Sequence, residues 1–351
     1  MSGGSGGTLA PWAAAAIACV GAGIVAEAIG LPAPWLLAGL LGGLAVAVTR
    51  GGALDVPQAP TVVSQAVVGV ALGASVAPGS LGGIAGAWPL VLALVAATLG
   101  SSVAVAFGLA RLTEIDRVTA ALGMLPGAAP ALIAVGDEVD ADARLVATMQ
   151  YGRVLLVVAT VPLLALLLGS GAAAPGPPRP EAPTGLEPGL AAAALAAAGA
   201  ALATLARAPA ASLVGPLILS AVAAATGIVP LAVPGLVADA AFVVVGASVG
   251  LRFDRESLRH AGRLAPYMAA AVLVLTVICA ALGVVLLAAL DTDPLTAYLA
   301  TTPGGISSVL AAAFDSGADL TVVVAVQTLR LMVLALAAPF AARLLRVRGA
   351  E

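Results

Sequence analysis

Long uncharged stretches, separated by short charged turns, dominate the chain. The longest of them cover residues 28–49, 56–110, 154–178, 208–238 and 264–290. A helix needs roughly 20 apolar residues to cross the hydrocarbon core of a bilayer. The stretch 56–110 is therefore long enough for two crossings. The pattern predicts a polytopic, all-α membrane protein.

The pattern resolves into full spans and two interrupted segments. The interrupted segments are 118–135 and 294–313, each broken by a Pro-Gly pair. Proline removes a backbone donor, and glycine permits unusual backbone angles, so a helix is expected to break there. The predicted full spans are about 9–29, 31–48, 61–77, 84–110, 144–168, 190–206, 211–229, 231–251, 265–289 and 320–342.

The sequence repeats itself at a constant spacing. We call this spacing the repeat offset, and it equals the separation between Pro126 and Pro303. Self-similarity of this kind indicates a duplicated architecture, and it is most convincing for residue types that are scarce in the chain. The coinciding pairs include Pro126/Pro303, Asp142/Asp319, Gln150/Gln327, Arg153/Arg330 and Pro162/Pro339. We interpret the chain as a first membrane repeat at 1–168, a Pro/Gly-rich linker at 169–189 and a second repeat at 190–351.

Composition agrees with a membrane protein and excludes several other classes. Of the 351 residues, 61% are hydrophobic and 9% are charged, whereas a soluble domain has about 25% charged residues. All fifteen basic residues are Arg and form no phosphate-binding stripe, so nucleic-acid binding is not expected. Cys19, Cys279 and His260 are too few and too scattered for a disulfide framework or a metal centre. No cofactor and no enzymatic activity are expected.

The distribution of charge predicts an orientation in the membrane. Under the positive-inside rule the Arg-bearing loops, and with them both termini, are cytoplasmic. Asp291 and Asp293 have no Arg nearby and are expected outside. This is satisfied if 118–135 and 294–313 are re-entrant, which leaves five full spans in each repeat. Because five is odd, the second repeat is inverted. The alternative, a broken helix that crosses the inner membrane, stays open at this point.

Each repeat carries the same constellation around its interrupted segment. Pro126-Gly127 in the first repeat and Pro303-Gly304-Gly305 in the second precede a short apolar helix. An acidic turn follows, and then a long span with Gln-x-x-Arg. A helix that starts after such a break presents free N–H groups with a partial positive charge. In inverted-repeat transporters, breaks of this kind form the substrate site.

Gln150 and Arg153 share a helix face, as do Gln327 and Arg330. Arg153 lies nine residues past Arg144, which is about 13 Å along a helix and close to mid-bilayer. An Arg at that depth costs at least ~2.5 kcal/mol and needs a partner. One interpretation is an anion clamp. The other is pairing with carbonyls freed by the broken helix, or with an acidic residue of another span.

Acidic residues supply further candidates. Glu27 and Asp239 are isolated acids within apolar spans, and each is interpreted as a proton- or ion-coupling group or as a counter-ion for a buried Arg. Glu27 lies near the end of its span, where it can also simply reach the interface. Asp142 and Asp319 are predicted helix N-caps, because Asp accepts hydrogen bonds from the first N–H groups of a helix.

Small and hydroxyl-bearing residues complete the candidate site. Ser307 and Ser308 offer hydroxyl ligands in the second repeat, whereas Ala129 and Pro130 stand near the corresponding place in the first. The Gly-x-x-x-Gly pairs at 39/43, 69/73 and 246/250 predict close helix packing. The candidate substrate-binding residues are Pro126, Gly127, Gln150, Arg153, Pro303, Gly304, Gly305, Ser307, Ser308, Gln327 and Arg330.

The twofold pattern of Pro-Gly, acidic turn, Asp and Gln-x-x-Arg resembles the AbrB-type duplicated membrane proteins. The segment GASVGLRFDRESL at 246–258 resembles them too. The resemblance covers nearly the whole chain. It implies kinship with inverted-repeat cation–proton antiporter and anion transporter folds, and it brings the family's labels of ammonia monooxygenase and regulator of gene expression. The first repeat reads PGAAP where the family pattern has a PGG-like turn, so equivalence of the two halves is open.

Together these observations predict a secondary transporter of a small anionic or polar solute, working by alternating access with H⁺ or Na⁺ coupling. The alternative is a membrane-embedded sensor or regulator that affects gene expression indirectly. A monooxygenase is disfavoured because no metal-ligand set is visible. The expected partners are the lipid bilayer and a small-molecule solute, and homo-oligomerisation is left open.

Overall fold

The computed structural model describes residues 9–29, 31, 33–50, 57–76, 86–127, 129–139, 141–167, 186–227, 229–252 and 262–348. The regular elements in these ranges are helices. His260 and residues 169–185 of the predicted linker lie outside the described residues. Residues 186–189, predicted as the end of the linker, form the first turn of a helix. Pro188 is tolerated there because the N–H it lacks would have no partner within the helix.

The helices of the two halves correspond one to one. The first half contributes α1 (Leu9–Ala28), α2 (Pro34–Arg50), α3 (Gln58–Ala74), α5 (Trp88–Leu112), α6 (Arg117–Met124), α7 (Ala129–Glu138) and α8 (Ala143–Leu167). The second contributes α9 (Leu186–Leu205), α10 (Ala211–Thr226), α11 (Gly235–Gly250), α13 (Ala265–Leu290), α14 (Pro294–Thr301), α15 (Ile306–Ser316) and α16 (Leu320–Arg348). Each of these second-half helices starts one repeat offset after its counterpart. The spacing found in the sequence is therefore also the spacing of the folded elements.

Paired prolines explain why several equivalent helices start where they do. Pro57 precedes α3 and Pro234 precedes α11 as the N-cap residue. Pro89 and Pro266 lie in the first turns of α5 and α13. Proline is favoured at such positions because the N–H it lacks would have no partner within the helix. The repeated prolines thus fix the same helix boundaries in both halves.

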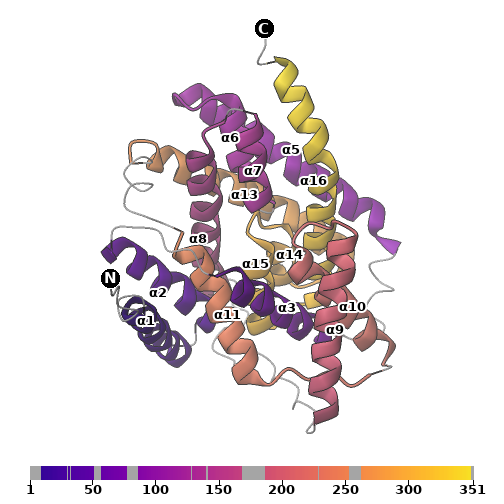
Figure 1. Ribbon diagram of the computed structural model, residues 1–351. Helices are drawn as coiled ribbons and strands as arrows, with labels where there is room; N and C mark the ends of the chain where they lie inside the picture. The colour runs from indigo at the N-terminus through magenta and orange to yellow at the C-terminus, as the bar shows by residue number, and fades with distance from the viewer. Residues whose placement is uncertain are drawn as a thin grey trace.

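The first three helices of each half form one row, which we call the outer row. Its packing order is α1, α2, α11, α3, α10, α9. In Figure 1, α1 and α2 lie at one side and α9 and α10 at the other, with α11 and α3 between them. If each helix is replaced by its counterpart in the other half, the same row results, read in the opposite direction. The reason is that α2 packs on α11 just as α10 packs on α3. The two halves are therefore interleaved rather than separate.

Glycines bring the helices of the outer row into backbone contact. A Cβ atom on Gly246 would lie 2.2 Å from the carbonyl oxygen of Leu36, and one on Gly39 would lie 2.1 Å from that of Val243. A Cβ on Gly69 would lie 2.5 Å from a backbone oxygen of α10. The close packing predicted from the Gly-x-x-x-Gly pairs is confirmed at these two interfaces.

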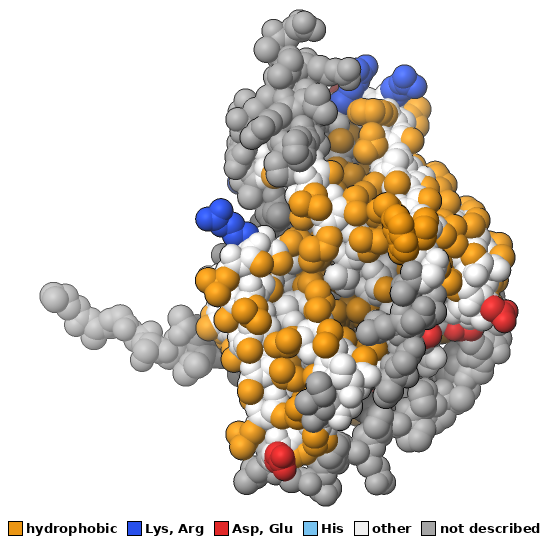
Figure 2. Space-filling model, turned by 90° about the vertical axis from the view of Figure 1, so that its right-hand side faces the viewer, with side chains coloured by type: hydrophobic (Ala, Val, Ile, Leu, Met, Phe, Trp, Pro, Cys, Tyr) orange, Lys and Arg blue, Asp and Glu red, His pale blue; other side chains and the backbone are white. Residues whose placement is uncertain are grey.

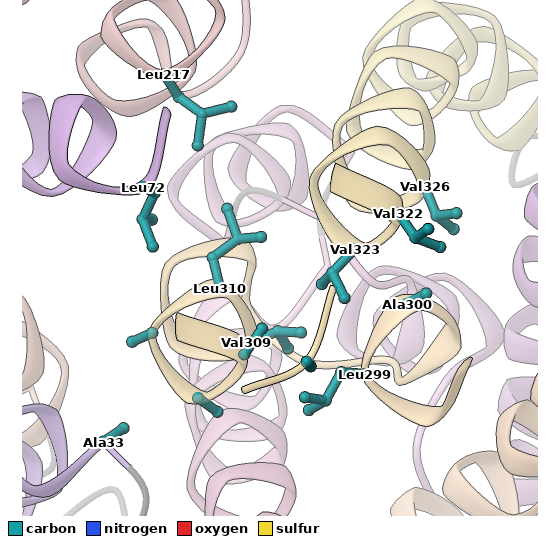
Figure 3. Packing of buried hydrophobic residues seen from close by; sticks show 14 of the residues in the cluster. Ala33, Leu72, Leu217, Leu299, Ala300, Val309, Leu310, Val322, Val323 and Val326 are labelled. Atoms are coloured by element: carbon teal, nitrogen blue, oxygen red, sulfur yellow. The ribbon is translucent and has the colours of Figure 1, made fainter. Parts of the chain in front are cut away.

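The remaining helices form a second group, the broken-helix group, made of α5 to α8 and α13 to α16. Here α5 packs on α13 and α6, α13 packs on α14, α8 packs on α6 and α7, and α16 packs on α14 and α15. Helix α15 also contacts α3 and α11 of the outer row. Figure 3 shows Val309 and Leu310 of α15 in one buried cluster with Leu72 of α3, Leu217 of α10 and Val323 of α16. The hydrophobic core thus joins the two groups.

The surface and the helix lengths fit a membrane protein. Among the described residues, four helical segments are long and apolar enough to cross a membrane: Trp88–Leu112, Glu187–Leu205, Ala265–Leu290 and Leu320–Ala337. Shorter apolar helices of 10–17 residues accompany them. The face in Figure 2 is largely apolar, with Arg side chains towards one end and acidic side chains towards the other. That distribution suits a surface in contact with lipid, with its charges at the two interfaces.

Candidate functional site

The interrupted segment of each half turns back on itself. The N–H of Asp142, at the start of α8, donates to the hydroxyl of Thr119, in the first turn of α6, at 2.9 Å. Asp319 and Thr296 repeat this bond at 2.7 Å in the second half. The beginning and the end of each segment therefore lie together, and the Pro-Gly break is the tip of a hairpin. This geometry fits the predicted re-entrant segment, because the two ends of each segment lie together.

The base of each hairpin is also capped by an aspartate that the sequence analysis missed. Asp116 Oδ1 accepts hydrogen bonds from the N–H groups of Val118, at 2.9 Å, and Thr119, at 2.8 Å. Asp293 Oδ1 accepts from the N–H of Thr296 at 2.9 Å, and the Thr296 hydroxyl donates to Asp293 Oδ2. Asp116 and Asp293 are related by the repeat offset, so that spacing contained the signal that would have found this pair.

Asp142 and Asp319 occupy the helix N-cap positions proposed for them. Asp142 Oδ1 accepts from the N–H of Leu145 at 2.9 Å. Asp319 Oδ1 accepts from the N–H groups of Thr321, at 2.8 Å, and Val322, at 3.4 Å. Each of these aspartates therefore serves two elements, because its side chain caps the long helix while its backbone N–H closes the hairpin.

A buried Gln–Arg pair holds the tip of the first hairpin. Gln150 Nε2 donates to the carbonyls of Leu122 and Leu125 at 2.6 and 3.0 Å. Arg153 Nη1 donates to the carbonyls of Met124 and Leu125 at 3.0 Å each, and its Nη2 donates to Gln150 Oε1 at 2.7 Å. The acceptors lie at the C-terminal end of α6, where helix carbonyls lack partners within the helix. The pair therefore satisfies the carbonyls that the break sets free.

The second hairpin is held in the same way. Gln327 Nε2 donates to the carbonyls of Leu299, at 2.8 Å, and Thr302, at 3.3 Å. Arg330 Nη1 donates to the Thr302 carbonyl at 2.7 Å, and Nη2 donates to the Gly304 carbonyl at 3.0 Å and to Gln327 Oε1. The two Gln-x-x-Arg motifs thus have the same structural role, since each holds the tip of the hairpin in its own half.

Of the two interpretations given to the buried Arg residues, the structure shows pairing with freed carbonyls. Arg153 and Arg330 are 1% and 4% exposed. Their described hydrogen bonds go to backbone carbonyls and to the amide oxygens of Gln150 and Gln327, and the counter-ion role of Glu27 and Asp239 stays a prediction. Glu27 is exposed near the end of α1, and Asp239 is half-buried in α11. Both acids lie on helices of the outer row, Glu27 on α1 and Asp239 on α11.

The two hairpin tips meet at a small cavity. Its volume is about 30 Å³, which is room for about one water molecule. A Cβ on Gly127 would lie 1.9 Å from the Leu334 side chain of α16, and one on Gly304 would lie 3.0 Å from Val157 of α8. Each tip therefore packs on the long helix of the other half. The cavity lining includes Pro126, Gly127, Gly304, Ile306, Gln327 and Arg330.

Other candidates lie near this cavity without lining it. The Ser308 hydroxyl donates to the Gly305 carbonyl at 2.8 Å, a bond within the start of α15. Ser307 is partly exposed in the same turn. Among the described residues, no group of three or more His, Cys, Asp or Glu side chains is placed to hold a metal ion. The proposed substrate-binding residues that line the cavity are Pro126, Gly127, Gly304, Gln327 and Arg330. Those that do not line it are Gln150, Arg153, Pro303, Gly305, Ser307 and Ser308.

Comparison with known proteins decides the family. A family model described as "Transition state regulatory protein AbrB" matches residues 35–346. The chain belongs to the AbrB family. A similar protein from Escherichia coli (strain K12), named "Putative regulator AbrB", is 33% identical over 317 residues, which cover 90% of this chain and 91% of that relative. The match to the AbrB family includes both Gln–Arg hairpins, and the resemblance predicted from the motifs is confirmed.

Proposed function

We propose that this AbrB-family protein is a secondary transporter that moves a small anionic or polar solute across the inner membrane by alternating access. The observation that carries the proposal is the pair of buried Gln–Arg hairpins whose tips meet at one cavity. Broken helices at membrane depth are the usual location of solute sites in duplicated transporters. The two halves would rock against each other around this point.

An inverted arrangement of the halves, as the hairpin geometry suggests, would support alternating access. The hairpins closed by Thr119 and Thr296 return to the side from which they start. Each half then has five crossing helices, and an odd number reverses the next half. Contacts in the outer row exchange between the halves, as expected for two related units that face opposite ways. In this arrangement both termini and most Arg residues are cytoplasmic.

The positive charge at the tips favours an anionic solute. Arg153 and Arg330 hold the two tips that meet at the small cavity. Within the described part of the chain, their hydrogen bonds go to carbonyls and amides, which leave the charge uncompensated. Buried cations without a counter-ion are costly, so an entering anion would be favoured. The cavity is too small for such a solute, so separation of the tips is required.

Ion coupling is assigned to Asp239 rather than to Glu27. Asp239 is half-buried on α11, which contacts α15 behind the second hairpin tip. Movement of α15 against α11 would change the surroundings of this carboxylate, and a changed environment is what couples a proton or cation to a conformational step. Glu27 is exposed on α1, which packs on α2 at the end of the outer row.

Uptake experiments test the proposal. A thermal-shift screen of small carboxylates, amino acids and ammonium on the purified protein selects a radiolabelled solute, which is then offered to proteoliposomes. We expect Arg153→Gln and Arg330→Gln each to lower uptake at least tenfold, and Arg111→Gln, at an exposed position at the end of α5, to leave it unchanged. Unchanged uptake in both tip variants would contradict the proposed role.

A membrane-embedded regulator is the second candidate, favoured by the name of the E. coli relative. Specific co-purification of one cytoplasmic protein with the full-length chain, together with the absence of uptake for every solute that shifts its melting temperature, would favour this alternative over transport.

A further inference from the structure

A polar contact ties the long helix of the first half, α8, to the outer row. Arg252, just after α11, donates from Nη1 to the hydroxyl of Tyr151 on α8 at 2.6 Å. The guanidinium carbon of Arg252 lies 5.3 Å from the centroid of the Tyr151 ring, which is within the range of a cation–π interaction. Tyr151 is buried, and Arg252 Nε donates to the carbonyl of Ser248 in α11. The contact therefore joins two side chains that are each held in place.

Apolar side chains close the same interface one turn further along both helices. Val154 lies three residues after Tyr151 and shares its helix face. With Leu40 of α2 and Val249 of α11, it belongs to one apolar cluster. The polar contact and this cluster together close α8 against the outer row at the C-terminal end of α11.

The equivalent positions of the second half are arranged differently. One repeat offset from Tyr151 stands Thr328 of α16, and one repeat offset from Arg252 stands Ser75, at the end of α3. The hydroxyl of Thr328 is buried and, in the described part of the chain, has no hydrogen-bond partner. The hydroxyl of Ser75 donates within its own helix, to the carbonyl of Ala71, at 2.9 Å. The second half thus leaves unpartnered the hydroxyl whose counterpart is bonded in the first.

The small cavity at the hairpin tips marks the same difference. Leu331, which is equivalent to Val154, lines this cavity together with Ala210 at the start of α10. The first half therefore packs α8 against the outer row, whereas the second half leaves space between α16 and α10. Two equivalent halves in unlike arrangements are what one conformation of a duplicated, two-state protein shows.

We infer that the contact between Tyr151 and Arg252 is a latch that holds α8 closed on the outer row in one state and opens in the other. The inference rests on the proposed alternating access, since it requires the two halves to exchange arrangements. When the second half takes the arrangement of the first, Thr328 reaches Ser75 and its hydroxyl gains a partner. Tyr151 then separates from Arg252. An unpartnered buried hydroxyl is unfavourable, so this exchange offsets part of the loss of the latch.

The latch and its counterpart lie at opposite faces of the membrane if the halves are inverted. Arg252 begins the Arg-bearing segment 252–263, which the positive-inside rule places in the cytoplasm. In the conformation with the latch formed, cytoplasmic access along α8 to the tips is therefore closed. The state with the latch open is the one that admits solute from the cytoplasm.

Three variants shift the balance between the two states in defined directions. Tyr151→Phe keeps the ring and removes the acceptor of the Arg252 hydrogen bond, whereas Arg252→Gln also removes the cation over the ring. Thr328→Val acts the opposite way, because it removes the hydroxyl that gains a partner when the latch opens and leaves the latch itself intact. Tyr267→Phe is the matched control, since Tyr267 is an exposed tyrosine near the start of α13.

The measurement is the rate at which a membrane-impermeant maleimide labels Val154→Cys in the full-length chain, with Cys19 and Cys279 replaced by alanine. Nanodiscs leave both membrane faces open to the reagent, so the result does not depend on sidedness. We expect Tyr151→Phe to raise the rate about fivefold and Arg252→Gln to raise it further, because each shifts the population towards the open latch. Thr328→Val lowers the rate, and Tyr267→Phe leaves it unchanged.

Equal labelling in the wild type, Tyr151→Phe and Arg252→Gln would overturn the inference. A rate in Thr328→Val at or above that of the wild type would do the same. General loosening of the fold raises the rate in every destabilised variant, so slower labelling in Thr328→Val distinguishes a latch from a merely structural contact. Unchanged labelling together with measurable uptake removes the latch and leaves the transport proposal standing. The expected labelling pattern without uptake of any solute supports the latch and counts against transport.

Discussion

The backbone N–H of Asp319 donates a 2.7 Å hydrogen bond to the hydroxyl of Thr296, 23 residues earlier in the chain. Asp142 and Thr119 form the same bond in the first half. These two bonds close both hairpins at their bases, while the Gln–Arg pairs hold their tips. The proposed solute site therefore rests on a framework that is tied at both ends by hydrogen bonds.

Thr296→Val tests the closure of the second hairpin. Valine keeps the shape of threonine but removes the acceptor of the Asp319 N–H and the bond to Asp293. Because Thr296 is fully buried, we expect a loss of about 1–3 kcal/mol in the free energy of unfolding. Thermal unfolding in detergent measures it. Thr226→Val is the control, since the hydroxyl of Thr226 is exposed and bonds only to carbonyls of its own helix, and an equal melting temperature for the two variants would contradict the closure role.

Arg330→Lys tests the fork geometry at the tip. The guanidinium group joins three acceptors, namely the carbonyls of Thr302 and Gly304 and Gln327 Oε1. A lysine ammonium keeps the charge but cannot span this planar arrangement. We expect a destabilisation of at least ~1.5 kcal/mol and a large loss of uptake. The control is Arg111→Lys, and wild-type melting and uptake for Arg330→Lys would show that charge alone is sufficient.

Gly246→Ala tests the packing of α2 on α11. The new Cβ would lie 2.2 Å from the carbonyl oxygen of Leu36, so the two backbones must separate. Overpacking of this kind costs about 1–3 kcal/mol. Gly108→Ala, where nothing lies within 4 Å, should instead stabilise the protein by up to about 1 kcal/mol through helix propensity. Melting temperatures that change in the same direction would argue against close backbone contact.

Much of the fold could be predicted because the two halves share residue types that are scarce in this chain at equivalent positions. The Pro-Gly pairs and the Gln-x-x-Arg motifs located the two hairpins, since prolines and buried charges tolerate few positions. The hydrogen-bond partners of Arg153 and Arg330 could not be predicted. They are backbone carbonyls 26 to 29 residues away, which become available only at the folded tips.

Other features depend on comparisons that the motifs alone do not suggest. The capping pair Asp116 and Asp293 shared the repeat offset but lay outside the conspicuous motif. Gly152 lines a cavity of about 180 Å³ between α8 and α13, and the equivalent position in the second half carries Leu329. In a chain rich in Gly and Ala, a single small residue does not predict a cavity. The cavity is recognised only once α13 is packed beside α8.

The inverted arrangement of the halves is tested most directly by the sidedness of two equivalent turns. Glu114, between α5 and α6, and Asp291, between α13 and α14, are both exposed and are related by the repeat offset. The measurement labels Glu114→Cys and Asp291→Cys, in a chain with Cys19 and Cys279 replaced by alanine, with a membrane-impermeant maleimide. We predict that Asp291→Cys is labelled in intact cells and Glu114→Cys only after permeabilisation. Labelling of both from the same side would contradict the inverted repeat and the transport mechanism built on it.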